Sequence, residues 1–297
     1  MSYVGILNYR GYRYLWFSLA VGLIASLVYV SQYAFETPRG NTWQGYALGA
    51  VAALGMFWLA YLGVRRRRYK AGGTPVLAWT SAHVYIGLLV LLIATLHSSA
   101  RITWTLHGVT YLLALIVTLS GVFGMVVYLV CPSLAAQNRH DGSRAQMFAQ
   151  LLDLDRKARA LARRCPPRIS SAVLSAVEGT LVGGGVWAQL SGVDHSRLLL
   201  IEDGRGGERS RWVRNRKQGT ITRYVAERIP QAAKRAEVEA LQELLPVLSR
   251  RQAVLHRIRV DIQLQGLMSI WLFVHVPLTV ALVGALLAHL VSVFIYW

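Results

Sequence analysis

Cysteine is scarce in this chain of 297 residues, which contains only Cys131 and Cys165. They form neither a CxxC pair nor a CxxCH motif, so the sequence predicts no cysteine-ligated iron–sulfur cluster and no covalently attached c-type heme. Two cysteines are also too few for a disulfide framework. We therefore interpret both as ordinary reduced thiols.

Acidic residues are few as well, with 14 Asp and Glu against 32 Lys and Arg and a net charge of +18. Only 15% of the residues are charged and 54% are hydrophobic, with a mean hydropathy of +0.39. This balance is unusual for a soluble domain and typical of a membrane protein. A basic chain can bind nucleic acid, but here the basic residues flank apolar segments, which argues against that class of partner.

Long apolar segments dominate the rest of the chain. A helix that crosses a bilayer needs ~20 apolar residues, and five segments are long enough: 15–35, 46–64, 76–98, 106–130 and 266–297. We therefore expect an all-α membrane protein built as a five-helix transmembrane bundle. Residues 1–130 would hold the first four helices, 131–265 a large, mostly helical insertion, and 266–297 the fifth helix that completes the bundle.

Lysine and arginine are distributed unevenly between the loops. The segment 131–265 contains 23 of the 32, and Arg65–Arg68 with Lys70 lie between the second and third apolar segments. With Arg10 and Arg13 before the first apolar segment, five spans place 30 of the 32 on one side and leave only Arg39 and Arg101 on the other. Because basic loops stay in the cytoplasm, we expect a bacterial inner-membrane type of protein with a cytoplasmic N-terminus and insertion and a periplasmic C-terminus.

Four histidines form two pairs with the same internal spacing. His83 and His97 lie in the third apolar segment, and His275 and His289 lie in the fifth. Fourteen helical steps come to four turns less about 40°, so both members of a pair share one helix face, ~21 Å apart along the axis. With five spans these two helices run parallel. His83 then lies level with His275 near the cytoplasmic side, and His97 lies level with His289 near the outer side.

This arrangement suits axial ligation of two stacked hemes. A neutral imidazole offers one ring nitrogen to iron, while its other nitrogen donates a hydrogen bond that orients the ring. Two imidazoles fill both axial positions, which favours electron transfer over oxygen chemistry. A single intramembrane histidine more often makes a hydrogen bond between helices, but two equally spaced pairs on parallel spans favour ligation.

Other residues near these levels are weaker candidates. Gly108 and Gly121 could let the fourth helix approach each heme closely, although ordinary packing of small residues explains them equally well. His107 could replace His97 or His289 as a ligand, hydrogen-bond a heme propionate or bind quinone. Arg101 could pair with heme propionates or simply anchor the interface.

The paired histidines on two spans resemble those of membrane di-heme b-type cytochromes. The pattern is similar to cytochrome b of the quinol–cytochrome c oxidoreductases and to the membrane domain shared by ferric reductases and NADPH oxidases. The resemblance covers the third to fifth spans and implies bis-histidine ligation of two b hemes by His83, His97, His275 and His289. Two departures are that the chain lacks a proline–glutamate–tryptophan–tyrosine motif and that no flavin or nicotinamide domain follows the fifth span. A third is the long basic insertion between the two heme helices.

The insertion itself shows local patterns but no catalytic constellation. Residues 146–164 predict an amphipathic helix that is stopped by Pro166 and Pro167. Residues 197–201 predict a short strand, 203–207 a turn followed by a basic stretch, and 230–266 a helix that runs into the fifth span. The charge of the insertion is about +10 by residue count, which suits either anionic lipid or an acidic redox partner.

These features predict transmembrane electron transfer through two b hemes, as the membrane subunit of a larger oxidoreductase. Expected partners are the lipid membrane, a cytochrome c, iron–sulfur or flavin subunit, and quinone at one face. One alternative is a ferric or metal reductase-like membrane domain fed by a separate flavoprotein. Another is a non-redox transporter or membrane scaffold whose histidines form a proton path.

Overall fold

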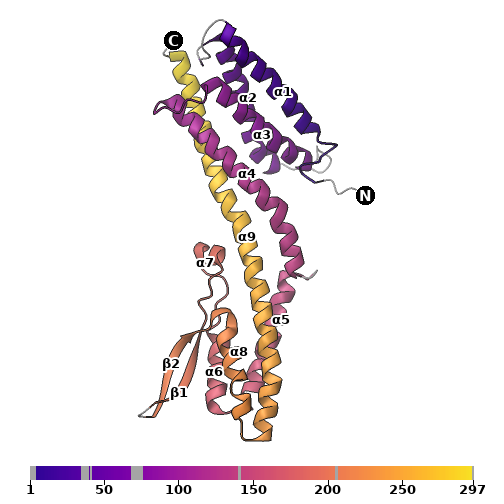
Figure 1. Ribbon diagram of the computed structural model, residues 1–297, viewed down its shortest axis with the longest axis vertical. Coiled ribbons are helices and arrows are strands. Elements are labelled where there is room, and N and C mark those ends of the chain that lie inside the picture. Colours follow the sequence, from indigo (N-terminus) through magenta and orange to yellow (C-terminus); the bar gives the residue numbers. More distant parts are fainter. Residues whose placement is uncertain are drawn as a thin grey trace. The chain divides into compact units, whose positions relative to one another are not determined.

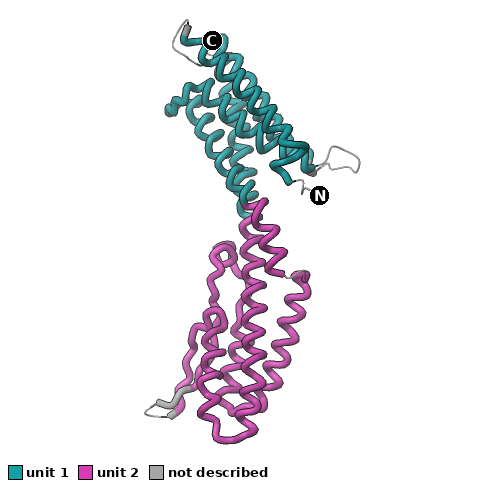
Figure 2. Tube along the Cα trace, turned by 45° about the vertical axis from the view of Figure 1, so that its right-hand side comes forward, with its two compact units in different colours: residues 1–126, 270–297 teal, residues 127–269 magenta. Residues whose placement is uncertain are grey.

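The protein is described here from a computed structural model, which covers residues 5–34, 40, 42–67, 76–139, 142–204 and 207–295. Arg39, Arg68, Lys70 and Trp297 therefore lie outside the described residues. The chain is mostly helical (Figure 1) and divides into two compact units. Unit 1 comprises Met1–Val126 and Ile270–Trp297, and unit 2 comprises Val127–Ser269 (Figure 2). Both boundaries fall inside long helices that contribute to each unit.

Unit 1 contains the apolar helices. They are α1 (Arg13–Ser31), α2 (Trp43–Arg67), α3 (Val76–Ser98), the first part of α4 (Leu106–Arg139) and the last part of α9 (Arg235–Ile295), with the short 3-10 helix η1 (Gln32–Ala34) after α1. Among the described residues, five helices are long and apolar enough to cross a membrane. The prediction of five apolar spans is therefore confirmed.

The core of unit 1 is built largely from small side chains. Ala52, Ala53 and Ala94 are buried there beside Ile93 and Leu286. In lipid no hydrophobic effect drives apolar helices together, so their association depends on close packing. Small residues permit this packing because they let the helices approach closely. Large apolar side chains point outward instead and are exposed: Trp16, Leu23, Leu27, Leu54, Phe273 and Phe294. Buried small residues and exposed large ones are the pattern expected of a bundle that faces lipid.

Unit 2 is a helical domain with one β-hairpin. Its elements are α5 (Arg144–Ala162), α6 (Pro167–Glu178), α7 (Val186–Ser191), β1 (Arg197–Gly204), β2 (Gly207–Arg214), η2 (Arg216–Gln218), α8 (Gly219–Ala226), η3 (Ile229–Gln231), the end of α4 and the first part of α9. The core of this unit joins α5, α6, β1, α8 and α9. This core includes the fully buried Leu198, Leu241 and Leu244, so unit 2 has a hydrophobic core of its own. Burying one leucine side chain stabilises the folded state by about 1.5–3 kcal/mol.

Local sequence explains where the helices of unit 2 begin. Ser143 caps α5, because its hydroxyl accepts the backbone N–H of Gln146 while the Gln146 side chain accepts the backbone N–H of Ser143. Such a capping box satisfies two donors that a helix start otherwise leaves free. Pro167 occupies the first turn of α6, where its missing N–H has no cost.

Two helices expected in the insertion are present. The helix expected at 146–164 is α5, and the helix expected to run from the insertion into the fifth apolar segment is the 61-residue α9. The strand is longer than the expected 197–201, and the basic stretch after the turn is its antiparallel partner β2. We missed β2 because its residues 208–212 are exposed on both faces. Without a buried face the strand has no alternation of apolar and polar residues.

Candidate functional site

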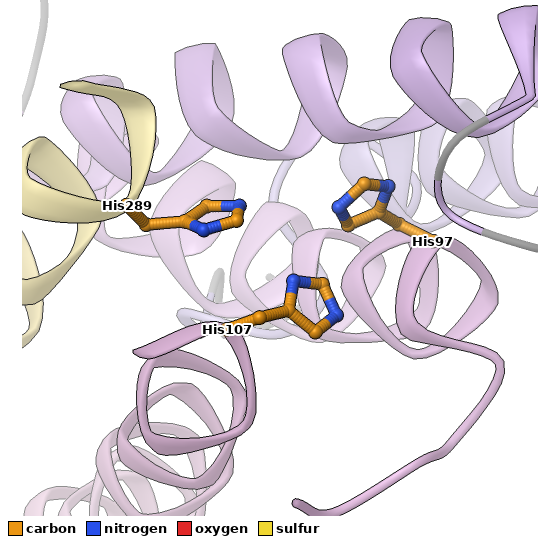
Figure 3. Close-up of side chains that lie close together, drawn as sticks. All are labelled: His97, His107 and His289. Atoms are coloured by element: carbon orange, nitrogen blue, oxygen red, sulfur yellow. The ribbon is translucent and has the colours of Figure 1, made fainter. Parts of the chain in front are cut away.

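Three histidines from three helices meet near one end of the apolar bundle (Figure 3). His97 comes from the end of α3, His107 from the start of α4, and His289 from α9. One ring nitrogen of each lies within 4.8 Å of the others. The ring centroids of His97 and His289 are 6.5 Å apart. The outer pair expected from the parallel helices is therefore brought together, with His107 added to it.

His97 is held in a defined tautomer. Its Nδ1 lies 2.8 Å from the carbonyl oxygen of Gly45 on α2. A carbonyl cannot donate a hydrogen bond, so Nδ1 carries the proton and Nε2 keeps its lone pair. Gly49, one turn further along α2, makes room for the ring, since a methyl group there would meet His97 Cε1 at 2.8 Å. These contacts orient Nε2 as a ligand atom.

The outer histidines line a cavity of about 970 Å³. Small residues of α2 and α3, among them Gly49, Ala53 and Ala94, open this space, and Arg101 and Tyr46 add polar groups. Cofactor sites typically have volumes of ~300–1,000 Å³ and are mostly apolar with a few placed polar groups. The cavity therefore has the size and lining of a site for a heme-sized ligand.

His107 lies between the other two rings. Its centroid is 5.2 Å from that of His97 and 5.1 Å from that of His289, closer than those two are to each other. A flat macrocycle ligated by His97 and His289 would pass through the same space. Binding of such a group therefore requires the His107 side chain to turn away.

A second cavity holds the inner pair. His83 from α3 and His275 from α9 line it together with Gly87, Gly121 and Met125. His83 Nδ1 is buried there without a hydrogen-bond partner among the described residues. A buried polar atom without a partner is costly and points to a missing ligand or water. The volume of this cavity is about 110 Å³.

His275 is oriented by α4. Its Nδ1 lies 2.6 Å from the hydroxyl of Ser120, and this hydroxyl donates its only proton to the carbonyl oxygen of Val117. In the arrangement where the hydroxyl bonds Val117, Nδ1 carries the proton and Nε2 is left as the ligand atom. Trp271 stacks on the imidazole at 5.2 Å and donates its indole N–H to the carbonyl oxygen of Ser120.

The two levels fit a heme to different degrees. The outer level offers two imidazoles, of which that of His97 is oriented by Gly45, together with an arginine and enough volume. The inner level offers the donor atoms but too little volume, so a macrocycle enters only if flexible neighbours such as Met56 and Met125 move aside. The donor chemistry fits the group at both levels, and the space fits it at the outer one once the His107 side chain turns away.

The secondary candidates are placed in different ways. Arg101 and His107 line the outer cavity, and Gly121 lines the inner one, where a methyl group would meet His275 Cε1 at 3.4 Å. Gly108 is not among the residues that line either of these two cavities. A methyl group there would overlap the backbone of Thr103, so this glycine serves the tight turn before α4.

Sequence reasoning missed the residues that orient the rings. Gly45, Gly49 and Ser120 lie on other helices and have no spacing relationship to the histidines in the sequence. Trp271 lies one helical turn before His275 on the same helix, a spacing that could have identified it. The small residues of the second apolar segment were a signal for close packing, but the partner helix was unknown. No protein-family model, no curated protein and no solved structure matches this chain.

Proposed function

We propose that this protein carries electrons across a membrane through two b hemes. His97 and His289 would hold the outer heme, and His83 and His275 the inner one. The observation that supports this most is that each histidine pair lines one cavity. In addition, His97 and His275 each have Nδ1 engaged, which leaves Nε2 available as a ligand.

A bis-histidine heme supplies a one-electron carrier with no open coordination position. The chain's own residues bind and orient it. Arg101 would neutralise propionate charge at the outer level, while the apolar helices exclude water. The described residues of unit 1 include no Asp or Glu, which favours ligation over a proton path, since such a path would need residues that exchange protons with water on both sides.

The positive-inside argument places the N-terminus and unit 2 in the cytoplasm and the C-terminus in the periplasm of a bacterial type of inner membrane. We propose that the chain is the membrane subunit of a redox complex. It would exchange electrons with quinone and with a cytochrome c, iron–sulfur or flavin protein. A metal reductase-like domain fed by a separate flavoprotein is the alternative partner arrangement within the same proposal.

Heme stoichiometry with a redox titration tests the proposal. The purified chain should show b-type absorbance with two hemes per chain. His97→Ala and His83→Ala should each remove one, and the double variant should remove both. His256→Ala in unit 2 is the matched control and should keep two. A colourless protein with intact helices would contradict the proposal and favour a non-redox transporter or scaffold.

One observation favours a second candidate at the outer level. Three imidazoles with ligand atoms within 4.8 Å of one another suit a transition-metal ion with an open fourth position. The two candidates assign opposite roles to His107, which obstructs the heme but ligates the metal ion. His107→Ala should leave two hemes per chain if the first proposal is right. If the site instead holds a metal ion, His107→Ala should abolish stoichiometric binding of Zn²⁺ or Co²⁺ to a chain that contains at most one heme.

A further inference from the structure

The segment from Leu181 to Val193, which contains α7, is unusual in unit 2. It has no charged residue between Glu178 and Asp194, although the unit as a whole is strongly basic. None of the residues of α7 is buried. Its large apolar side chains are open, with Trp187 84% exposed and Leu181, Val186 and Val193 at 50–58%. Scattered exposed apolar residues are normal, but several in one short segment mark a binding surface.

The segment is fixed against α9 at a defined position (Figure 1). The side-chain amide of Gln263 donates to the carbonyl oxygen of Leu190 at 3.4 Å. A methyl group on Gly266 would meet Leu190 Cδ2 at 3.7 Å. Just beyond α7, Asp194 forms an ion pair of 2.8 Å with Arg259 of α9. The α7 segment therefore cannot slide along α9 without breaking this ion pair, which is almost buried.

The contact lies where the charged part of α9 gives way to its uncharged, apolar part. Asp261 is the last charged residue of α9, and 266–295 contains none. If α9 crosses the membrane, the bilayer surface lies near Gly266, because charged side chains stay outside the apolar core. The residues of α7 touch α9 at that same level. Their open apolar side chains would then lie beside the lipid headgroups.

We propose that the α7 segment is an interfacial membrane anchor that inserts Trp187 and Val186 into the cytoplasmic leaflet. Tryptophan is favoured at this depth because its ring is amphipathic. Gly183 and Gly184 have φ angles of +86° and +117°, so they allow the backbone reversal that presents α7. The anchor rests on the membrane placement of α9 but not on the hemes.

Probe accessibility in nanodiscs tests the anchor. Single cysteines are introduced into the full chain in a Cys131→Ala, Cys165→Ala background and labelled with a polarity-sensitive nitrobenzoxadiazole. Trp187→Cys reports on α7. Trp212→Cys, on the exposed face of the hairpin, is the aqueous control, and Phe273→Cys, 79% exposed on α9, is the lipid control. Each probe is compared with and without spin-labelled lipid, so that constant quenching by a bound cofactor cancels. Val186→Cys repeats the test if Trp187→Cys is poorly folded.

The expected result is that spin-labelled lipid quenches the probes at 187 and 273 several-fold more than the probe at 212, while aqueous iodide quenches the probe at 212 most. If the probe at 187 behaves like that at 212 while the probe at 273 is quenched by lipid, the anchor is wrong. The membrane placement of α9 then stands. If the probe at 273 is not quenched by lipid, the membrane placement fails, and with it both the anchor and transmembrane electron transfer.

Discussion

The imidazole of His97 donates its Nδ1 proton to the carbonyl oxygen of Gly45, 2.8 Å away on the preceding helix. This bond joins α2 to α3 and selects the tautomer with Nε2 free. It also means that α2, which contributes no histidine, decides how the outer ligand is presented. Partners that orient a ligand in this way commonly change metal affinity about 10–100-fold when they are lost.

Gly49→Ala should impair the outer site. Its new methyl group would overlap the His97 ring, with contacts of 2.8 and 2.9 Å to Cε1 and Nδ1. We expect the heme content to fall from two toward one per chain, or the affinity for the second heme to drop about tenfold or more. Pyridine hemochrome assays measure the content. Gly63→Ala on the same helix meets nothing within 4 Å and should keep both hemes.

Ser120→Ala should change the midpoint potential of the heme proposed at the inner site. The Nδ1 proton of His275 loses its acceptor, which lowers the basicity of the ligating nitrogen. We expect one of two midpoint potentials to rise in an optical redox titration while the other stays. Ser133→Ala removes a hydroxyl that is bonded only to the carbonyl oxygen of Val130 on the same helix. It serves as the control, and an equal shift there would contradict the assigned contact.

Asp261→Asn should destabilise unit 2. The carboxylate is fully buried, and Arg139 and Arg144 each donate to it at 2.5 Å. Because the side chains of Arg139 and Arg144 are 26% and 38% exposed, water partly replaces the lost carboxylate, and the expected cost is about 1–3 kcal/mol. Asp153→Asn breaks the exposed pair with Lys157 and should cost about 0–1 kcal/mol. Thermal unfolding in detergent compares the two, and equal melting temperatures would contradict the prediction.

Cys165 should react slowly with thiol reagents near neutral pH. Burial raises the pKa of its thiol, the charge of Glu237 raises it further, and Arg164 acts in the opposite direction. Since the thiolate is the nucleophile, alkylation should accelerate as the pH rises through the raised pKa. Mass spectrometry of a Cys131→Ala variant between pH 7 and 10 follows the rate. A rate already at its plateau at pH 8 would show that the thiol is not shielded.

Much of the fold followed from patterns that are local in the sequence. A bilayer requires long uncharged runs, and these runs fix the first three apolar helices within a few residues, whereas α4 and α9 extend well beyond their apolar parts. Leu244, Leu248, Leu255 and Ile258 recur at helical spacing and are buried on the face of α9 that packs in unit 2. The hairpin partner β2 was missed because its residues 208–212 are exposed on both faces, so its period of two did not show as an apolar alternation.

The sequence by itself determined the helices, the basic insertion and the spacing that puts both histidines of a pair on one helix face. Helical geometry is enough for this, because it depends only on the distance along the chain. Only the tertiary structure decided that His107 lies between His97 and His289, that Gly45 and Ser120 orient two of the rings, and that the two cavities differ in volume. These contacts join residues far apart in the chain, and packing between helices sets them.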